Sequence, residues 1–203
     1  MLFIEKLRRD SGFPTVAVAQ AWLDRADFAG VLDAHARRSF VRGIRHKPRP
    51  GMMDDRRWRA GYRRLAPLGL HFELQAPWRQ LDEAARLARD FSDTLIVLNH
   101  AGLPSDGALP AWRGALSEFA ACPNTAIKIS GLGTVTRKRE VVLAAIELFG
   151  VQRAMFASNF PVDGLCASFD SIYAGFDEIT RGFSAAERRA LFHDNAVRLY
   201  RMK

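Results

Sequence analysis

Polar side chains stand where short apolar runs end along this chain. His100 closes the run LIVLNH, Arg45 and His46 close an earlier run, and Gln75 and Asn159 close two others. Histidine binds metals, polarises carbonyls and moves protons near neutral pH, while arginine holds carboxylates through paired hydrogen bonds. Because side chains alternate along a strand, only one of Arg45 and His46 can face a given pocket. These residue types indicate a site for a small molecule, with the arginine suited to an anionic one.

Three further candidates lie in the second half of the chain. Lys128 falls inside an apolar run and Ser130 follows it, so each fits a polar pocket better than an apolar interior. Asp163 comes shortly after Asn159, in a position where a carboxylate can act as a general base for water. Simpler interpretations stay open, because a lysine can extend outward between helices and an aspartate can accept a hydrogen bond within a turn.

Strand-forming runs and amphipathic helical patterns alternate from one end of the sequence to the other. An alternation of this kind predicts a parallel sheet flanked by helices. No linker or low-complexity tract interrupts it, so residues 1–203 are expected to form a single domain. The predicted strands span residues 13–19, 40–45, 70–75, 95–98, 125–129 and 154–157.

Two closures of such a sheet are compatible with the pattern, an open doubly wound sheet and a barrel. A doubly wound dinucleotide-binding sheet needs a glycine-rich loop after its first strand, and residues 20–23 contain no glycine. Polar residues at the carboxyl end of strand after strand are instead typical of a TIM barrel. A complete barrel takes about 250 residues, or about 31 for each unit, so six units need about 190. We therefore expect an α/β fold, a TIM (β/α)8 barrel that lacks its first two strand–helix units and has six parallel strands with flanking helices.

Several motifs together resemble the amidohydrolase-related branch of the amidohydrolase superfamily. They are IVLNHAGLP (96–104), AIKISGLG (126–133), MFASNFPVD (155–163) and LFHDNAVRLYR (191–201), and residues 12–24 look like the third strand of such a barrel and the turn after it. The resemblance covers essentially the whole chain. That branch comprises predicted metal-dependent TIM-barrel hydrolases and includes lactonases, so the resemblance implies a metal-dependent hydrolase.

The resemblance also implies a reaction and roles for the candidate residues. The enzyme would open a lactone, a cyclic ester, of a small carboxylated or sugar-acid substrate by directing water at the carbonyl. His100 matches the strand-end histidine that binds a metal or polarises this carbonyl. It would act together with Asn159 and Asp163 as the catalytic group. Substrate binding would fall to Arg45 or Lys128, for a carboxylate or the oxyanion, and to His46, Gln75 and Ser130.

The chain departs from the family pattern in two ways that bear on a metal. It contains no H-x-H pair, which supplies two ligands in the family, and Asn159 stands where the last strand usually ends in an aspartate. A divalent metal, zinc or manganese, agrees with the resemblance, whereas the missing pair favours a site without one. A second interpretation therefore stays open, in which the chain is a non-catalytic, truncated remnant that acts as a structural or interaction protein.

Composition excludes some classes of partner. The formal net charge is +8, but no zinc-finger or RNA-binding motif accompanies the basic residues between Arg37 and Arg64, so no nucleic-acid partner is expected. The excess charge is assigned to a solvated face or to the attraction of an anionic small substrate. No apolar run reaches about 18 residues and the N-terminus does not resemble a secretory signal, so no membrane partner and a cytoplasmic location are expected. The open edges of a six-stranded sheet would allow two copies to pair as a homodimer.

Overall fold

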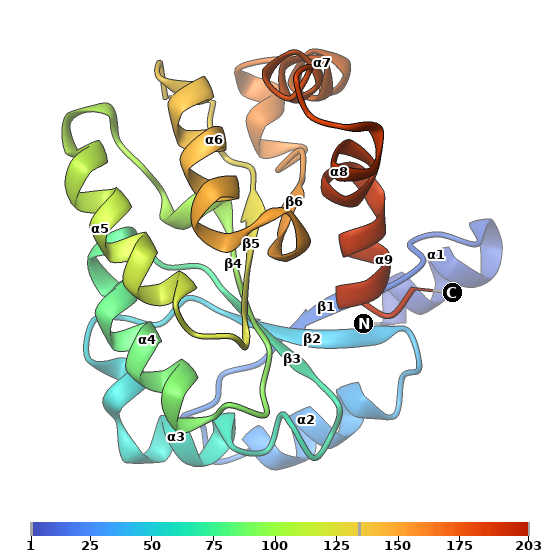
Figure 1. Cartoon of the computed structure of the whole chain (residues 1–203). Helices are drawn as coiled ribbons and strands as arrows, with labels where there is room; N and C mark the ends of the chain where they lie inside the picture. The colour runs from blue at the N-terminus through green and yellow to red at the C-terminus, as the bar shows by residue number, and fades with distance from the viewer. Residues whose placement is uncertain (1, 134, 203) are drawn as a thin grey trace.

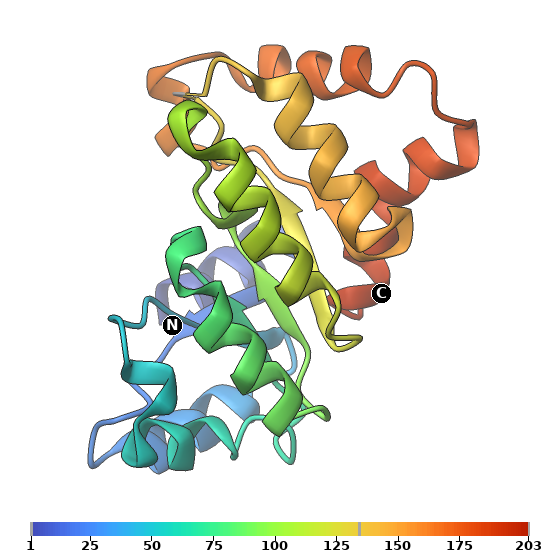
Figure 2. The ribbon, with the colours of Figure 1, turned by 60° about the vertical axis from the view of Figure 1, so that its left-hand side comes forward.

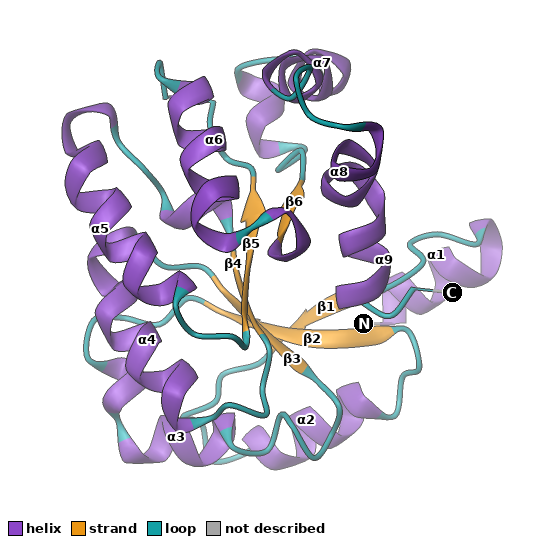
Figure 3. Cartoon of the chain, viewed as in Figure 1, coloured by secondary structure: helices purple, strands orange, loops and turns teal. Residues whose placement is uncertain are grey.

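The six predicted strands form one continuous parallel sheet. A computed structural model of the chain describes residues 2–133 and 135–202. The strands pair in chain order, every neighbouring pair is parallel, and the sheet is curved (Figures 1 and 3). The expected architecture is thus confirmed, with two strands fewer than the eight that close a TIM barrel. The strands are β1 (Ala17–Gln20), β2 (Val41–His46), β3 (His71–Leu74), β4 (Ile96–Leu98), β5 (Thr125–Ile129) and β6 (Ala154–Phe156).

Helices α2 to α6 follow the outer side of the curved sheet, and α7 lies beyond the carboxyl end of β6 (Figures 1 and 2). Ala196 and Leu199 of α9 pack against the small apolar cluster on the inner side. A π-helical segment, Ala190–Asp194, joins α8 to α9. None of the helices in the described ranges is long and apolar enough to cross a membrane. The helices are α1 (Leu2–Ser11), α2 (Phe28–Ala36), α3 (Arg56–Tyr62), α4 (Leu81–Asp90), α5 (Leu109–Ala120), α6 (Lys138–Phe149), α7 (Phe169–Ile179), α8 (Ala185–Arg189) and α9 (Asn195–Leu199).

The boundaries of the strands differ most at the first one. The run 13–19 predicted a strand from Phe13, but β1 begins at Ala17. Pro14 has no backbone N–H to donate to a ladder, which explains why pairing starts after it. Helix α1 was not assigned from the sequence. One domain over residues 1–203 stays a prediction, and residues 1, 134 and 203 lie outside those described.

Alternation along the strands divides the buried side chains between two faces. On the outer face, Phe72 of β3 packs edge-on against Trp58 and Tyr62 of α3, within the main hydrophobic core. On the inner face, a much smaller apolar cluster contains Val97, Ala126, Met155 and Tyr200. The inner face therefore has room for polar side chains.

A buried carboxylate occupies the middle of this inner face. Glu73 of β3 is 2% exposed. Lys128 of β5 donates to both of its oxygens, at 3.1 and 2.9 Å, and the Tyr200 hydroxyl donates to Oε1. Nε2 of His71 lies 3.6 Å from the same oxygen. Burial alone would raise the pKa of Glu73, but the Lys128 charge and these neighbours hold it well below its ordinary value.

Removing the cation from this cluster should destabilise the fold. We expect Lys128→Met to lower the free energy of unfolding by about 3–5 kcal/mol, because an unpaired carboxylate stays buried. Urea denaturation followed by circular dichroism measures the loss. Lys6→Met is the control, since Lys6 pairs with Asp10 on the surface and an exposed pair contributes at most about 1 kcal/mol. Equal effects in the two variants would contradict this account of Glu73.

The cluster also predicts how stability depends on pH. A carboxyl group whose pKa is lowered by folding stabilises the native state above its unfolded pKa, about 4.3 for glutamate. This contribution is lost as the pH falls from there toward the lower folded pKa. We expect the unfolding free energy to fall below about pH 4.3, and to fall less steeply in Glu73→Gln, in urea titrations at successive pH values. Parallel curves for the two proteins would show that Glu73 does not titrate in this way.

Candidate active site

Four of the sequence-predicted residues meet at the carboxyl ends of adjacent strands. Arg45 is the last residue but one of β2, Gln75 follows β3, His100 follows β4 and Ser130 follows β5. The Arg45 Nη2 donates to Oε1 of Gln75 and lies 3.3 Å from Nε2 of His100. The His100 Nδ1 lies 3.0 Å from the Ser130 Oγ. A continuous hydrogen-bonded chain therefore crosses the mouth from β2 to β5.

The partners of His100 fix the proton on its ring. A guanidinium group only donates, so His100 Nε2 must accept from Arg45, and Nδ1 then carries the hydrogen that is donated to Ser130. Burial lowers the pKa of His100 to about 4, with help from the positive charges of Arg45 and Lys128 and against the negative charge of Asp163. The imidazole is therefore neutral at pH 7, with the lone pair of Nε2 directed at Arg45.

The backbone at both ends of the site adopts a conformation that side chains rarely take. His100 and Asn159 each have φ of 54°. Gly131 has φ of 67°, and a Cβ atom placed on it would lie 2.9 Å from the His100 Cβ. Glycine is thus required at 131 to let the β5 loop pass directly beside His100. Left-handed non-glycine residues cluster at functional sites, where the surrounding structure holds them in place.

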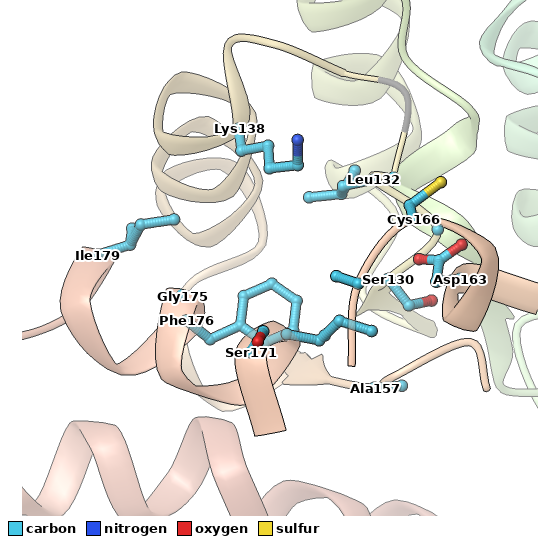
Figure 4. Close-up of a pocket in the computed structure, with 14 residues that line it drawn as sticks. Ser130, Leu132, Lys138, Ala157, Asp163, Cys166, Ser171, Gly175, Phe176 and Ile179 are labelled. Atoms are coloured by element: carbon cyan, nitrogen blue, oxygen red, sulfur yellow. The ribbon is translucent and has the colours of Figure 1, made fainter. Parts of the chain in front are cut away.

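Asp163 and Asn159 form a second polar pair on the loop after β6. The Asn159 Nδ2 donates to Oδ1 of Asp163 at 2.8 Å. Asp163 lies in a short 3-10 turn, Val162–Leu165, and lines the same cavity as Ser130. Figure 4 shows the Asp163 carboxylate beside Ser130, at one end of this cavity. The structure therefore brings a carboxylate close to the group around His100.

Two of the predicted residues lie apart from this group. His46 points to the outer face of the sheet, where its Nδ1 accepts a hydrogen bond from Trp58 Nε1 at 3.0 Å. Lys128 points inward, but it is paired with Glu73 beneath the mouth. Glu73 itself was missed from the sequence. The sequence did contain a signal for it. Glu73 stands two positions before Gln75, and because side chains alternate along a strand, the two residues share one face of β3.

Among the residues that the structure describes, the side chains do not form a binding site for a divalent metal. Across residues 2–133 and 135–202, no group of three or more histidine, cysteine, aspartate or glutamate side chains converges to hold an ion. The neighbours of His100 are a guanidinium group and a hydroxyl, and the guanidinium would repel a cation at Nε2. The chemistry available from these residues is therefore that of Arg45, His100 and Asp163.

Known proteins resemble this chain in sequence over most of its length. A family model described as Amidohydrolase matches residues 5–202. The uncharacterised protein y4mH of Sinorhizobium fredii is 43% identical over 94% of this chain and 71% of its own length. An L-fucono-1,5-lactonase of Burkholderia multivorans is 31% identical over 91% of this chain and 71% of its own length.

Solved structures of similar proteins share the fold. The crystal structure of an amidohydrolase from Burkholderia multivorans with bound zinc superimposes with a TM-score of 0.91 at 29% identity, covering 100% of this chain and 78% of that one. A divalent metal is thus part of a similar protein, although the residues described here form no set of ligands for one. Because the family model spans residues 5–202 and the lactonase is 31% identical, the chain belongs to the amidohydrolase family.

Proposed function

We propose that this amidohydrolase opens a lactone of a small, anionic, carboxylated or sugar-acid substrate by attack of water on the ring carbonyl. The observation that carries the proposal is the placement of a half-buried cation, Arg45, and a carboxylate, Asp163, near the neutral His100. The name of the similar Burkholderia multivorans protein, L-fucono-1,5-lactonase, supports the choice of a cyclic ester.

Arg45 supplies the positive charge that the reaction needs. Water attack turns the carbonyl oxygen into an oxyanion, and a preorganised cation in a partly dry site stabilises that charge strongly. Gln75 and His100 accept from one nitrogen of the guanidinium group and so fix its plane. Its Nε is buried and has no partner among the described residues.

Asp163 is suited to take the proton from water. Asn159 occupies Oδ1, which leaves Oδ2 free of side-chain donors within the described ranges. As water adds to the carbonyl carbon, its proton passes to Asp163. The carbonyl re-forms, the ring C–O bond breaks, and the same proton passes to the departing ring oxygen, so the product is an open-chain hydroxy acid.

Three substitutions test these roles. With a panel of sugar-acid and carboxylated lactones, we expect Asp163→Asn to lower kcat about 10²–10⁴-fold, since it removes the base. Arg45→Gln should lower it about 10²–10³-fold through loss of the charge on the oxyanion. His100→Ala should also lose turnover, because Arg45 is no longer held. Asp170→Asn, at an exposed carboxylate on α7, is the matched control.

The same assay distinguishes the proposed hydrolase from the second interpretation, a non-catalytic remnant. If the chain is a non-catalytic remnant, the unaltered protein will hydrolyse none of these lactones faster than His100→Ala does. Folding of each variant is checked by its urea midpoint, so that a loss of turnover is not confused with unfolding.

The proposed chemistry uses Arg45, rather than a metal ion, as the source of positive charge. We therefore expect turnover to be unchanged after dialysis against EDTA and after addition of zinc or manganese, measured as acid release in a weakly buffered assay. The physical reason is that a cation at His100 Nε2 must displace the guanidinium group that already lies 3.3 Å away. Loss of activity with EDTA that zinc restores would contradict this proposal.

A further inference from the structure

A mainly apolar cavity lies next to the candidate catalytic residues and is not used by the reaction proposed above. It has a volume of about 160 Å³ and lies between the loop after β5 and one face of α7 (Figure 4). Its apolar wall consists of Leu132, Ala157, Ile172, Phe176 and Ile179. Ser130 and Asp163 line it as well, so it opens directly onto the site.

Most of the cavity lining is apolar, and its charged and hydroxyl side chains each have a partner within the protein. Lys138 Nζ donates to the Val135 carbonyl at 2.6 Å, and the Ser171 Oγ lies 2.8 Å from the Ser168 Oγ. Ser130 is held by His100, and Asp163 accepts from Asn159 at Oδ1 and keeps Oδ2 for the reaction proposed above. A hydroxylated substituent on a substrate would lose hydrogen bonds to water in this cavity and gain few from its mainly apolar wall, which is unfavourable. A hydrocarbon group meets no such cost.

We infer that this cavity binds a hydrocarbon arm on the lactone, so that the preferred substrates carry an alkyl or phenyl substituent beside the reacting carbonyl. The inference rests on the proposed function and narrows its substrate class. An apolar cavity of about 150 Å³ in another protein accommodates benzene, which sets the arm at about four to six carbons. The polar ring then faces Arg45 and Gln75 while the arm lies against α7.

Helix α7 offers a position at which the cavity can be filled without disturbing its walls. Gly175 lines the cavity between Ser171 and Ile179, one helical turn away on either side. A Cβ atom at Gly175 would meet no atom within 4 Å. Leucine also favours a helix more than glycine does, so Gly175→Leu should fold. Gly114→Leu is the matched control, since Gly114 lies on the exposed face of α5 and its Cβ would also meet nothing within 4 Å.

The first test is a series of lactones that differ only in the length of the arm, from methyl to butyl, with a phenyl member. For the unaltered chain we expect kcat/KM to rise about fourfold with each buried CH₂. Gly175→Leu should lose this rise and still turn over the methyl lactone, whereas Gly114→Leu should keep it. Rates that are independent of arm length in the unaltered chain would overturn the inference.

The second test needs no turnover and separates this inference from the proposed function. Cys166 is exposed and lines the cavity, whereas Cys122 is buried. The lactam that carries the butyl arm should slow alkylation of Cys166 by iodoacetamide, and the methyl lactam should not. Protection without hydrolysis of any lactone supports the cavity and contradicts the proposed chemistry. Hydrolysis with equal rates along the series and no protection supports the chemistry and contradicts the cavity.

Discussion

A single buried carboxylate constrains much of this structure. Glu73 lies at the centre of the inner face of the sheet, where a buried carboxylate needs an opposite charge and hydrogen-bond donors close to it. Those partners come from β5, through Lys128, and from the C-terminal segment, through Tyr200. The contacts of Glu73 with Lys128 and Tyr200 therefore connect β3 to β5 across β4 and hold the C-terminal segment against the inner face.

The same cluster bears on the chemistry above it. Lys128 of β5 stands two residues before Ser130, which follows the strand. The positive charge of Lys128 lowers the pKa of His100, and the negative charge of Glu73 raises it. Burial and the charge of Arg45 have the largest effects on this pKa, and both lower it, so the imidazole is neutral. A neutral His100 can accept from Arg45, whereas an imidazolium would repel it. The fold and the site are therefore linked by electrostatics as well as by position.

Much of this arrangement was predictable from the sequence, and its limits have physical causes. Strand ends in a parallel sheet converge, so Arg45, Gln75, His100 and Ser130 were expected together from their places alone. The outward turn of His46 depends on Trp58, which lies on a different element, and the pairing of Lys128 depends on Glu73, 55 residues away. Local pattern contains no information on such partners. The pairing of two copies through the edges of β1 and β6 stays a prediction, since it too depends on a partner outside the pattern.

The two halves of the candidate site stand on different elements of the fold. The polar half is built on strand ends, whose ladders fix each residue against its neighbours. The apolar half is the inner side of α7, in which Phe176 is buried and stacks on Phe156 of β6 at 4.3 Å between ring centroids. Ile172 and Ile179 of α7 also pack against the main core. Because this wall stands on α7, its lining residues can change without moving Arg45 or His100, which lie at the ends of β2 and β4. The proposed choice of substrate arm therefore rests mainly on α7 and the proposed reaction on Arg45, His100 and Asp163, so a substitution on α7 is expected to alter the first and leave the second intact.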